Sequence, residues 1–252
     1  MSERRPVLVV QHEDECPPAW FGQWLGSTGV ELDVRRPYAG EPLPTGLGDH
    51  AGLLVLGGAM GADDDADYSW LAPTRTLLAE ACDTGVPTLG ICLGHQLLAV
   101  AAGGRVERLS TGRQCGLLPV GWTDQAGGDE LLGPLVRAGG YDQPLAVHWN
   151  VDVVTVLPPG AVALAHTPSG ALQAMRVTPC AWGIQAHPEA GLDVVTAWMQ
   201  HDPPAASAPE HQLWCDLAAG EPTVRAAWEP LATGFARLVL ARRAATPLAA
   251  TR

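Results

Sequence analysis

The sequence describes an acidic chain of 252 residues with a net charge of −12. A chain of this length can bury a core as one large α/β domain or as two small ones. The negative charge argues against a partner with a phosphate backbone, so no nucleic acid is expected. All 15 basic residues are arginines, which excludes a Walker lysine, a pyridoxal Schiff base and a lysine nucleophile.

The six cysteines are scattered, with no C-x-x-C pair and no histidine at metal-ligand spacing. This distribution predicts neither a metal site nor a disulfide framework, and it fits a reducing cytoplasm. The first apolar run breaks at Gln11 and His12, so it is too short for a secretory signal. No segment approaches the length of a membrane span. We therefore expect a cytoplasmic protein without membrane contact and without a cofactor.

Up to residue 104, short apolar segments alternate with helical ones. The predicted strands cover 6–12, 30–36, 52–58 and 86–91. Three helices are predicted here. The first carries Trp20 to Leu25, the second covers 68–85, and the third runs from the residue after Cys92 to Gly103. Strands that are apolar throughout and separated by helices are typical of a parallel sheet covered on both faces.

From residue 104 the pattern changes to a run of strands with turn signals between them. These strands are predicted at 105–110, 115–122, 143–149, 151–157, 161–167, 171–177 and 181–187. We expect part of this run to pair in an antiparallel manner. The tail is predicted to be helical over 192–200, 210–219 and 223–244, with a proline-rich hinge at 201–209. The simplest organisation is one domain over 1–200 with a helical extension, 201–252, packed on it.

Cys92 stands between Gly90 and Gly94, where the fourth strand passes into a helix. A nucleophile elbow needs this pattern, because a side chain two residues before or after the nucleophile would collide with neighbouring backbone. The positive end of the helix dipole favours a thiolate there. The amide of Leu93 would point toward a developing oxyanion. The alternative is a buried structural cysteine in a glycine-rich turn.

A candidate base lies at the end of the last predicted strand, in the segment AWGIQAHPEAG. Residues two apart in extended backbone point to the same side, so Glu189 can reach the imidazole of His187. The carboxylate would fix the tautomer and stabilise the imidazolium, while the other ring nitrogen accepts the thiol proton. Either residue alone could be structural. Together with the elbow cysteine they predict a Cys-His-Glu triad.

The segment VLGGAMGADDD places two glycines at the end of the third strand. Glycine lets the backbone approach a ligand closely, so the amide of Gly58 is a candidate second oxyanion donor. An ordinary glycine turn is the alternative. The aspartates within 62–67 lack the glycine and glutamate of an EF-hand loop. We interpret them as a solvated acidic lid.

The segments GICLGHQLLA, LGGAMGADDD and GIQAHPEAG resemble the three signature segments of class I glutamine amidotransferases. The resemblance covers about residues 50–190 and is closest to stand-alone proteins similar to the amidotransferase domain of GMP synthetase. It implies a three-layer α/β/α fold with a flavodoxin-like, mostly parallel sheet, an antiparallel strand extension and C-terminal helices. It also implies hydrolysis of the side-chain amide of glutamine through a γ-glutamyl thioester, with release of ammonia.

The resemblance assigns roles to particular residues. Cys92 is the nucleophile, His187 is the base and acid, and Glu189 orients the histidine. Gly58 and Leu93 supply the oxyanion amides. The residues implied to bind the substrate are Gly57, Gln96, His148 and Asp152. For Trp149, beside His148, a place in the pocket and a place in the core are both open.

Two positions depart from the family pattern. Ala186 stands where members usually have a large aromatic residue, and Val151 stands where glycine is common. Family members usually pass ammonia to a synthetase domain, yet this chain carries no ATP-binding signature. The sequence therefore leaves two functions open. One is delivery of ammonia to an acceptor or a partner synthetase subunit, and the other is partner-free hydrolysis of a γ-glutamyl amide or peptide.

Three other interpretations fit less well. An enzyme similar to dienelactone hydrolases would place its acid before a distant histidine, whereas Glu189 follows His187 at once. Peptidases and chaperones with a comparable elbow have a histidine directly after the cysteine, where this chain has Leu93. The third is a non-catalytic, amidotransferase-like partner protein, and an intact triad argues against it.

Overall fold

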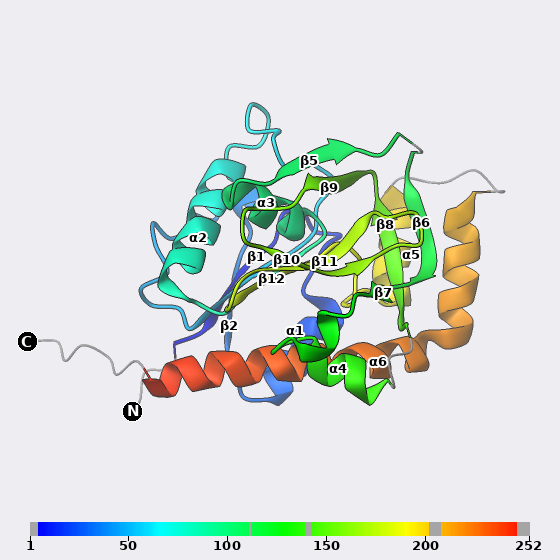
Figure 1. Ribbon diagram of the computed structural model, residues 1–252. Helices are drawn as coiled ribbons and strands as arrows, with labels where there is room; N and C mark the ends of the chain where they lie inside the picture. Colours follow the sequence, from blue (N-terminus) through cyan, green and yellow to red (C-terminus); the bar gives the residue numbers. More distant parts are fainter. Residues whose placement is uncertain (1–4, 111, 140–142, 202–207, 246–252) are drawn as a thin grey trace, which may run out of the picture.

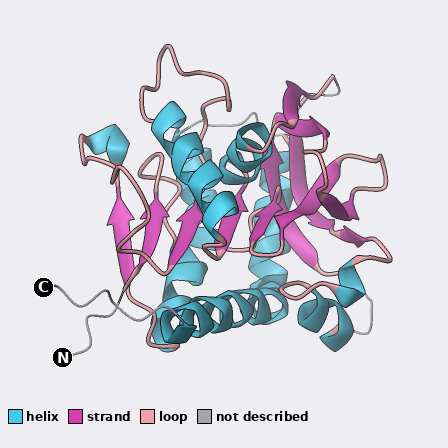
Figure 2. Ribbon diagram, turned by 60° about the vertical axis from the view of Figure 1, so that its left-hand side comes forward, coloured by secondary structure: helices cyan, strands magenta, loops and turns pink. Residues whose placement is uncertain are grey.

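The computed structural model describes residues 5–110, 112–139, 143–201 and 208–245. Its centre is an eight-stranded sheet in the order β2-β1-β3-β4-β12-β11-β10-β7 (Figure 2). The strands are β1 (Val7–Val10), β2 (Leu32–Arg35), β3 (Gly52–Val55), β4 (Thr88–Ile91), β7 (Gly121–Trp122), β10 (Val162–His166), β11 (Leu172–Thr178) and β12 (Ala181–Ile184). The strands from β2 to β12 in this order are parallel, and β11, β10 and β7 continue the sheet in antiparallel pairs.

Helices cover both faces of the sheet (Figure 1). They are α1 (Ala19–Ser27), α2 (Leu71–Thr84), α3 (Leu93–Ala101), α4 (Gly133–Ala138), α5 (Leu192–His201) and α6 (Pro209–Ala245). Val7 and Val9 of β1 belong to the core shared with α1, α5 and α6, and Leu8 and Val10 belong to the core shared with α2 and α3. Neighbouring strand residues point to opposite faces, so a strand covered on both sides is apolar throughout. The predicted three-layer, mostly parallel α/β fold is confirmed.

Two smaller strand pairs lie beside the main sheet. They are β5 (Arg105–Arg108) with β9 (Asp152–Val156), and β6 (Gln114–Pro119) with β8 (Leu145–Asn150). Both pairs are antiparallel. Strand β8 also reaches the end of β12, because the backbone N–H of His187 donates to the carbonyl oxygen of Val147 at 2.8 Å. The later part of the chain therefore folds back onto the end of the parallel sheet.

The tail differs from the sequence prediction. Segments 210–219 and 223–244 form one helix, α6, which contains Pro222 and Pro230. Figure 1 shows that α6 changes direction along its length, as expected for a helix that proline kinks rather than ends. Buried side chains such as Trp228 and Phe235 hold it against the core. The predicted hinge, 201–209, lies mostly outside the described residues. No helix in the described ranges is both long and apolar enough to cross a membrane.

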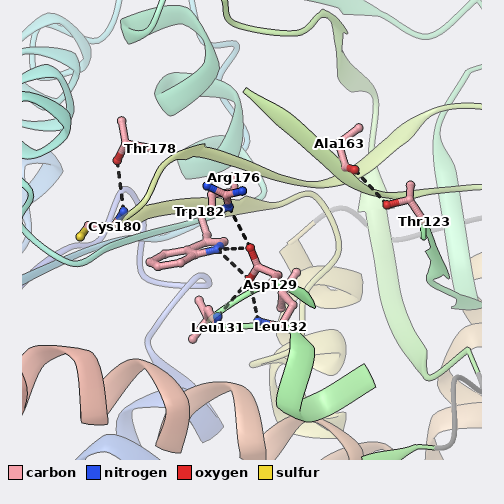
Figure 3. Close-up of polar contacts among 9 residues, drawn as sticks. All are labelled: Thr123, Asp129, Leu131, Leu132, Ala163, Arg176, Thr178, Cys180 and Trp182. Atoms are coloured by element: carbon pink, nitrogen blue, oxygen red, sulfur yellow. Dashed lines mark hydrogen bonds and ion pairs between the residues drawn. The ribbon is translucent and has the colours of Figure 1, made fainter. Parts of the chain in front are cut away.

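The sequence did not predict α4 or the two short 3₁₀ turns η1 (Pro37–Ala39) and η2 (Ala126–Gly128). The segment between η2 and α4 is held by a buried carboxylate (Figure 3). Asp129 accepts hydrogen bonds from Trp182 Nε1 at 3.0 Å, from Arg176 Nε at 3.0 Å, and from the N–H groups of Leu131 and Leu132 at 2.9 Å each. Because a buried carboxylate needs such partners, this cluster ties the segment to β11 and β12.

Candidate active site

Cys92 occupies a strained turn between β4 and α3, with φ +50° and ψ −107°. A positive φ is unfavourable for a residue with a side chain and is concentrated at functional sites. A Cβ atom at position 90 would lie 2.3 Å from the carbonyl oxygen of Gly94, and one at position 94 would lie 2.1 Å from that of Val55. The turn therefore requires both glycines, as the elbow interpretation predicts.

His187 and Glu189 follow β12, the parallel neighbour of β4. The carboxyl ends of parallel strands meet at one edge of the sheet, and the N–H of Cys92 donates to the carbonyl oxygen of Ile184 at 2.8 Å. His187 Nδ1 lies 2.8 Å from Glu189 Oε1, and the His187 side chain also hydrogen-bonds with the Cys92 side chain. All three side chains are buried. The structure brings together the three residues that the sequence predicts as a triad.

The surroundings of His187 favour its charged form. Burial lowers the pKa of the imidazole, but the charges of Cys92 and Glu189 and hydrogen bonds to both raise it. The balance holds the pKa of His187 well above its usual value. Since Nδ1 is bonded to Glu189, Nε2 is left for the thiol. This arrangement can take a proton from sulfur and keep it close to the reacting atoms.

The two predicted oxyanion donors lie next to the thiol. Gly58 lines the same cavity as Cys92, and Leu93 is the first residue of α3, where a backbone N–H has no acceptor within the helix. A Cβ atom at position 57 would lie 3.0 Å from His187 Cε1, and one at position 58 would lie 2.6 Å from Met60 Sδ. Both glycines thus leave room for close packing, and the oxyanion role remains a prediction.

A cavity of about 160 Å³ opens beside Cys92. Gln96 and Asp152, two of the predicted substrate-binding residues, line it, and so does Val151. Gly57 lies against the His187 ring instead. His148 is fully buried, and burial together with the charge of His187 lowers its pKa to about 4.

Gln96 is tied to both sides of the site. Its Nε2 donates to the carbonyl oxygen of Asp152 at 2.9 Å and to Gln185 Oε1 at 3.2 Å. Gln185 Nε2 in turn lies 3.6 Å from Cys92 Sγ. Sequence reasoning missed Gln185, which stands two residues before His187, just after β12 ends at Ile184.

Aromatic rings and a cation line the cavity beyond the imidazole. The Trp198 ring lies 4.7 Å from that of His187, with an interplanar angle of 61°. The Trp149 ring lies 5.4 Å from that of Trp198, and Arg113 Cζ lies 5.2 Å from the Trp149 ring centroid. Of the two places that the sequence left open for Trp149, it takes both, because its side chain lines the cavity and also packs against the core. Sequence reasoning missed Trp198 and Arg113, for which no local pattern exists.

The loop between β1 and α1 adds a carboxylate and a second thiol to the same cavity. Glu13 Oε1 accepts the S–H of Cys16 at 3.1 Å, and Oε2 accepts the N–H of Ala59 at 3.2 Å. Burial, followed by the charge and the hydrogen bond of Glu13, raises the pKa of Cys16 well above its usual value. Cys16 is therefore kept as a thiol, and Glu13 fixes the backbone directly after Gly58.

The predicted acidic lid at 62–67 is braced from within the chain. Asp65 forms an ion pair with Arg75 at 2.7 Å, and Asp64 Oδ2 accepts the N–H of Gly61 at 2.6 Å. Within the described ranges, no group of three or more histidine, cysteine, aspartate or glutamate side chains is arranged to hold a metal ion.

Comparison with known proteins gives the site a family context. The family model "Glutamine amidotransferase class-I" matches residues 23–199, more than half of the chain. γ-Glutamyl peptidase 5 of Arabidopsis thaliana is 29% identical over 182 residues, which are 69% of this chain and 68% of that protein. The glutamine-hydrolysing GMP synthase of Aeropyrum pernix is 31% identical over 166 residues, which are 64% of this chain but 28% of that protein. The crystal structure of a glutamine amidotransferase from Methylobacillus flagellatus matches with a TM-score of 0.80 at 26% identity, covering 93% of this chain and 95% of that one.

Proposed function

This chain belongs to the class I glutamine amidotransferase family, and on that premise we propose that it hydrolyses the side-chain amide of glutamine through a thioester on Cys92. Ammonia is released to an acceptor or to a partner synthetase. The observation that carries this proposal is the strained elbow at Cys92, with His187 and Glu189 hydrogen-bonded beside it. Strain of this kind persists only where the surrounding structure enforces it.

In the first half of the reaction, His187 takes the proton of Cys92 and the thiolate adds to the amide carbon. The carbonyl oxygen becomes an oxyanion, which the amides of Gly58 and Leu93 hold. When this intermediate collapses, the C–N bond breaks and His187 gives its proton to the leaving nitrogen. Ammonia departs, and the γ-glutamyl group remains on sulfur as a thioester.

In the second half, water takes the place of the ammonia. His187 accepts a proton from the water as its oxygen adds to the thioester carbon, and the C–S bond then breaks. Glutamate leaves, and the thiolate is again paired with the imidazolium. Glu189 keeps its hydrogen bond to Nδ1 and stabilises the imidazolium each time it forms.

A second candidate function is hydrolysis of a γ-glutamyl amide or peptide without a partner. The match to γ-glutamyl peptidase 5 of Arabidopsis thaliana favours it, because this match spans about two thirds of both chains. The cavity favours it as well, because side chains from the β1–α1 loop, including Glu13 and Glu15, line it next to Gly58. A leaving group larger than ammonia would contact the side chains of this loop.

The test is to incubate the purified chain with glutamine, γ-glutamyl methylamide and γ-glutamylglycine and to identify the products by mass spectrometry. We expect glutamate from at least one substrate, and none from the Cys92→Ala variant. Cys215→Ala is the matched control, because Cys215 is exposed on α6, and it should behave as the unmodified chain. Hydrolysis that survives in Cys92→Ala, or no hydrolysis of any substrate, contradicts the proposal.

The same panel separates the two candidates. Val151 and Ala186 depart from the family pattern, so we expect slow turnover of glutamine by the chain alone. Faster turnover on adding a synthetase that accepts ammonia supports the amidotransferase function, through a shift toward the competent state. Faster turnover of γ-glutamylglycine with no partner supports the peptidase function. Rapid hydrolysis of glutamine alone, without preference for the larger substrates, contradicts both versions.

A further inference from the structure

A buried amide approaches the thiol of Cys92 from within the protein. Nε2 of Gln185 lies 3.6 Å from Cys92 Sγ, which is a hydrogen-bond distance for the large sulfur atom. The Gln185 side chain is fully buried and lies outside the cavity lining, to which Cys92 belongs. The amide therefore contacts the sulfur and leaves the cavity side of the thiol to the substrate.

The hydrogen bonds around Gln185 decide which end of its amide faces the sulfur. They start from the backbone carbonyl oxygen of Asp152, which can only accept. It accepts from Nε2 of Gln96 at 2.9 Å, and the same Nε2 donates to Oε1 of Gln185 at 3.2 Å. Turning the Gln96 amide over would place two acceptors against each other, and turning the Gln185 amide over would place two donors against each other. Gln185 therefore presents its N–H₂ group to Cys92.

Such a hydrogen bond acts differently on the two forms of a cysteine. A thiol sulfur is a weak acceptor, whereas a thiolate carries a full charge and accepts strongly. A hydrogen bond to the charged form of a group favours that form. Cys92 and His187 are both buried, and a buried ion pair is stable only when further hydrogen bonds satisfy its atoms. Gln185 supplies such a bond to the sulfur, as Glu189 does to the imidazole.

We propose that Gln185 is a catalytic residue that stabilises the thiolate of Cys92 through its side-chain N–H, and that Gln96 is a positioning residue that keeps the Gln185 amide in this orientation. A continuous chain of hydrogen bonds then runs from the backbone of Asp152, at the start of β9, through both amides to the nucleophile. This inference rests on the proposed function and deepens it, because the thiolate is the nucleophile which that function requires.

The first experiment measures how the thiolate population of Cys92 depends on pH, without any turnover. The chain is treated with iodoacetamide at a series of pH values, and mass spectrometry of the peptide that contains Cys92 gives its alkylation rate. The thiolate is the reactive form, so the midpoint of the profile reports the balance of thiol and thiolate in the Cys92–His187 pair. Gln185→Met removes the N–H donor at similar side-chain length. We expect the midpoint to move to higher pH by about one unit, with the maximal rate kept within about threefold.

Gln173→Met is the matched control. Gln173 is also fully buried, and its backbone carbonyl oxygen accepts the N–H of Gln185 at 2.8 Å. Its side-chain Nε2, however, donates to Gln114 Oε1 at 3.4 Å. The same substitution at the same degree of burial should therefore leave the midpoint of the alkylation profile in place.

The second experiment tests the role of Gln96. In Gln96→Met the Gln185 amide is free to turn, so the midpoint should move to higher pH by about half a unit. In a Gln185→Met background the same change should move it no further, because no amide is left to orient, whereas a general loss of packing would act in both backgrounds. In the active chain, both single variants should move the acidic limb of the kcat/KM profile to higher pH.

An unchanged midpoint in folded Gln185→Met overturns the proposal, and so does an equal shift in Gln173→Met. A Gln96→Met shift that persists in the Gln185→Met background contradicts the positioning role. Melting temperatures show which variants are folded, and if Gln185→Met is not, an unchanged midpoint in Gln96→Met overturns the proposal in its place. These outcomes are separate from the turnover panel, which tests the proposed function by the release of glutamate whatever the alkylation profile.

Discussion

Nδ1 of His187 and Oε1 of Glu189 lie 2.8 Å apart, and the two side chains are only 3% and 4% exposed. Water screens such a pair very little, so the carboxylate acts strongly on the proton affinity of the ring. Burial alone lowers the pKa of His187, and the two neighbouring acids, Cys92 and Glu189, more than reverse this effect. The charged imidazole therefore depends on Glu189.

Glu189→Gln should shift the pH dependence of activity in a defined direction. The glutamine keeps the shape of the side chain but removes its charge, so the pKa of His187 falls. Activity that needs the imidazolium should then be lost at a lower pH than in the unmodified chain. The alkaline limb of the kcat/KM profile should move to lower pH by about one unit or more. We expect kcat to drop by about 10²- to 10⁴-fold.

The measurement is a profile of kcat/KM against pH for both chains. Glu107→Gln, an exposed carboxylate on β5, is the control and should leave the profile unchanged. An alkaline limb that stays in place in Glu189→Gln means that another group sets the protonation of His187.

The strained backbone at Cys92 gives a prediction about stability that is separate from activity. Cys92→Ala and Cys92→Gly should both be inactive. Only glycine adopts φ +50° without strain, so Cys92→Gly should be more stable than Cys92→Ala by about 1 kcal/mol. Urea denaturation of the two variants measures this difference. The reverse order, with Cys92→Ala more stable, would show that the turn stores no strain.

The triad could be predicted because each of its parts is encoded locally. Gly90 and Gly94 mark the turn around Cys92, and the spacing of two places Glu189 beside His187. The parallel sheet was predictable for a similar reason, since strands buried on both faces have no polar alternation.

Other parts of the site depend on contacts between distant segments. Arg113 contacts Trp149 and Glu210, and Trp149 in turn contacts Trp198. These three partners come from three separate elements, β8, α6 and α5. No spacing rule links such positions, so periodicity cannot find them. Helix α6 was predicted as two pieces because Pro222 disfavours helix, and the packing of the helix against the core outweighed that local preference.

Three buried histidines predict that the fold weakens in acid. Burial is the first cause in each case, and it lowers the pKa of His12 to about 3 and the pKa values of His95 and His148 to about 4. In the unfolded chain these rings take up protons below about pH 6.5, while in the folded chain they stay neutral. The contribution of these three histidines to stability is therefore complete above about pH 6.5 and is lost as the pH falls, by about 2 kcal/mol per histidine at pH 5.

The check is the free energy of unfolding between about pH 7 and pH 5 for the unmodified chain and for His95→Gln. Removing one titrating ring should make the pH dependence less steep by about 2 kcal/mol over this interval, whatever the variant's stability at pH 7. His211→Gln, at an exposed position of α6, is the control and should keep the original slope. An unchanged slope in His95→Gln would mean that His95 is charged in the folded protein.

Substitution of Asp129, which lies away from the thiol, should lower the stability of the fold. Its side chain is fully buried and binds Arg176, Trp182 and two backbone N–H groups. Asp129→Asn keeps the volume but removes the charge that balances Arg176, and it places an amide N–H₂ among donors. Arg176 is 32% exposed, so water compensates part of its charge, and we expect a loss of about 2 to 3 kcal/mol. This loss corresponds to a melting temperature about 5 to 10 °C lower for a chain of this size.

Asp124→Asn changes an exposed aspartate just before η2 and should be neutral. If Asp129 acts through Arg176, the double variant Asp129→Asn, Arg176→Gln should lose less stability than the sum of the two single changes. Turnover per folded molecule should remain near that of the unmodified chain at temperatures where the variant is folded, because Asp129 does not line the cavity beside Cys92. Additive losses would show that the carboxylate is held by the backbone N–H groups and Trp182 alone. An unchanged melting temperature in Asp129→Asn would show that the charge of this carboxylate is not needed to hold the segment between η2 and α4 on the sheet.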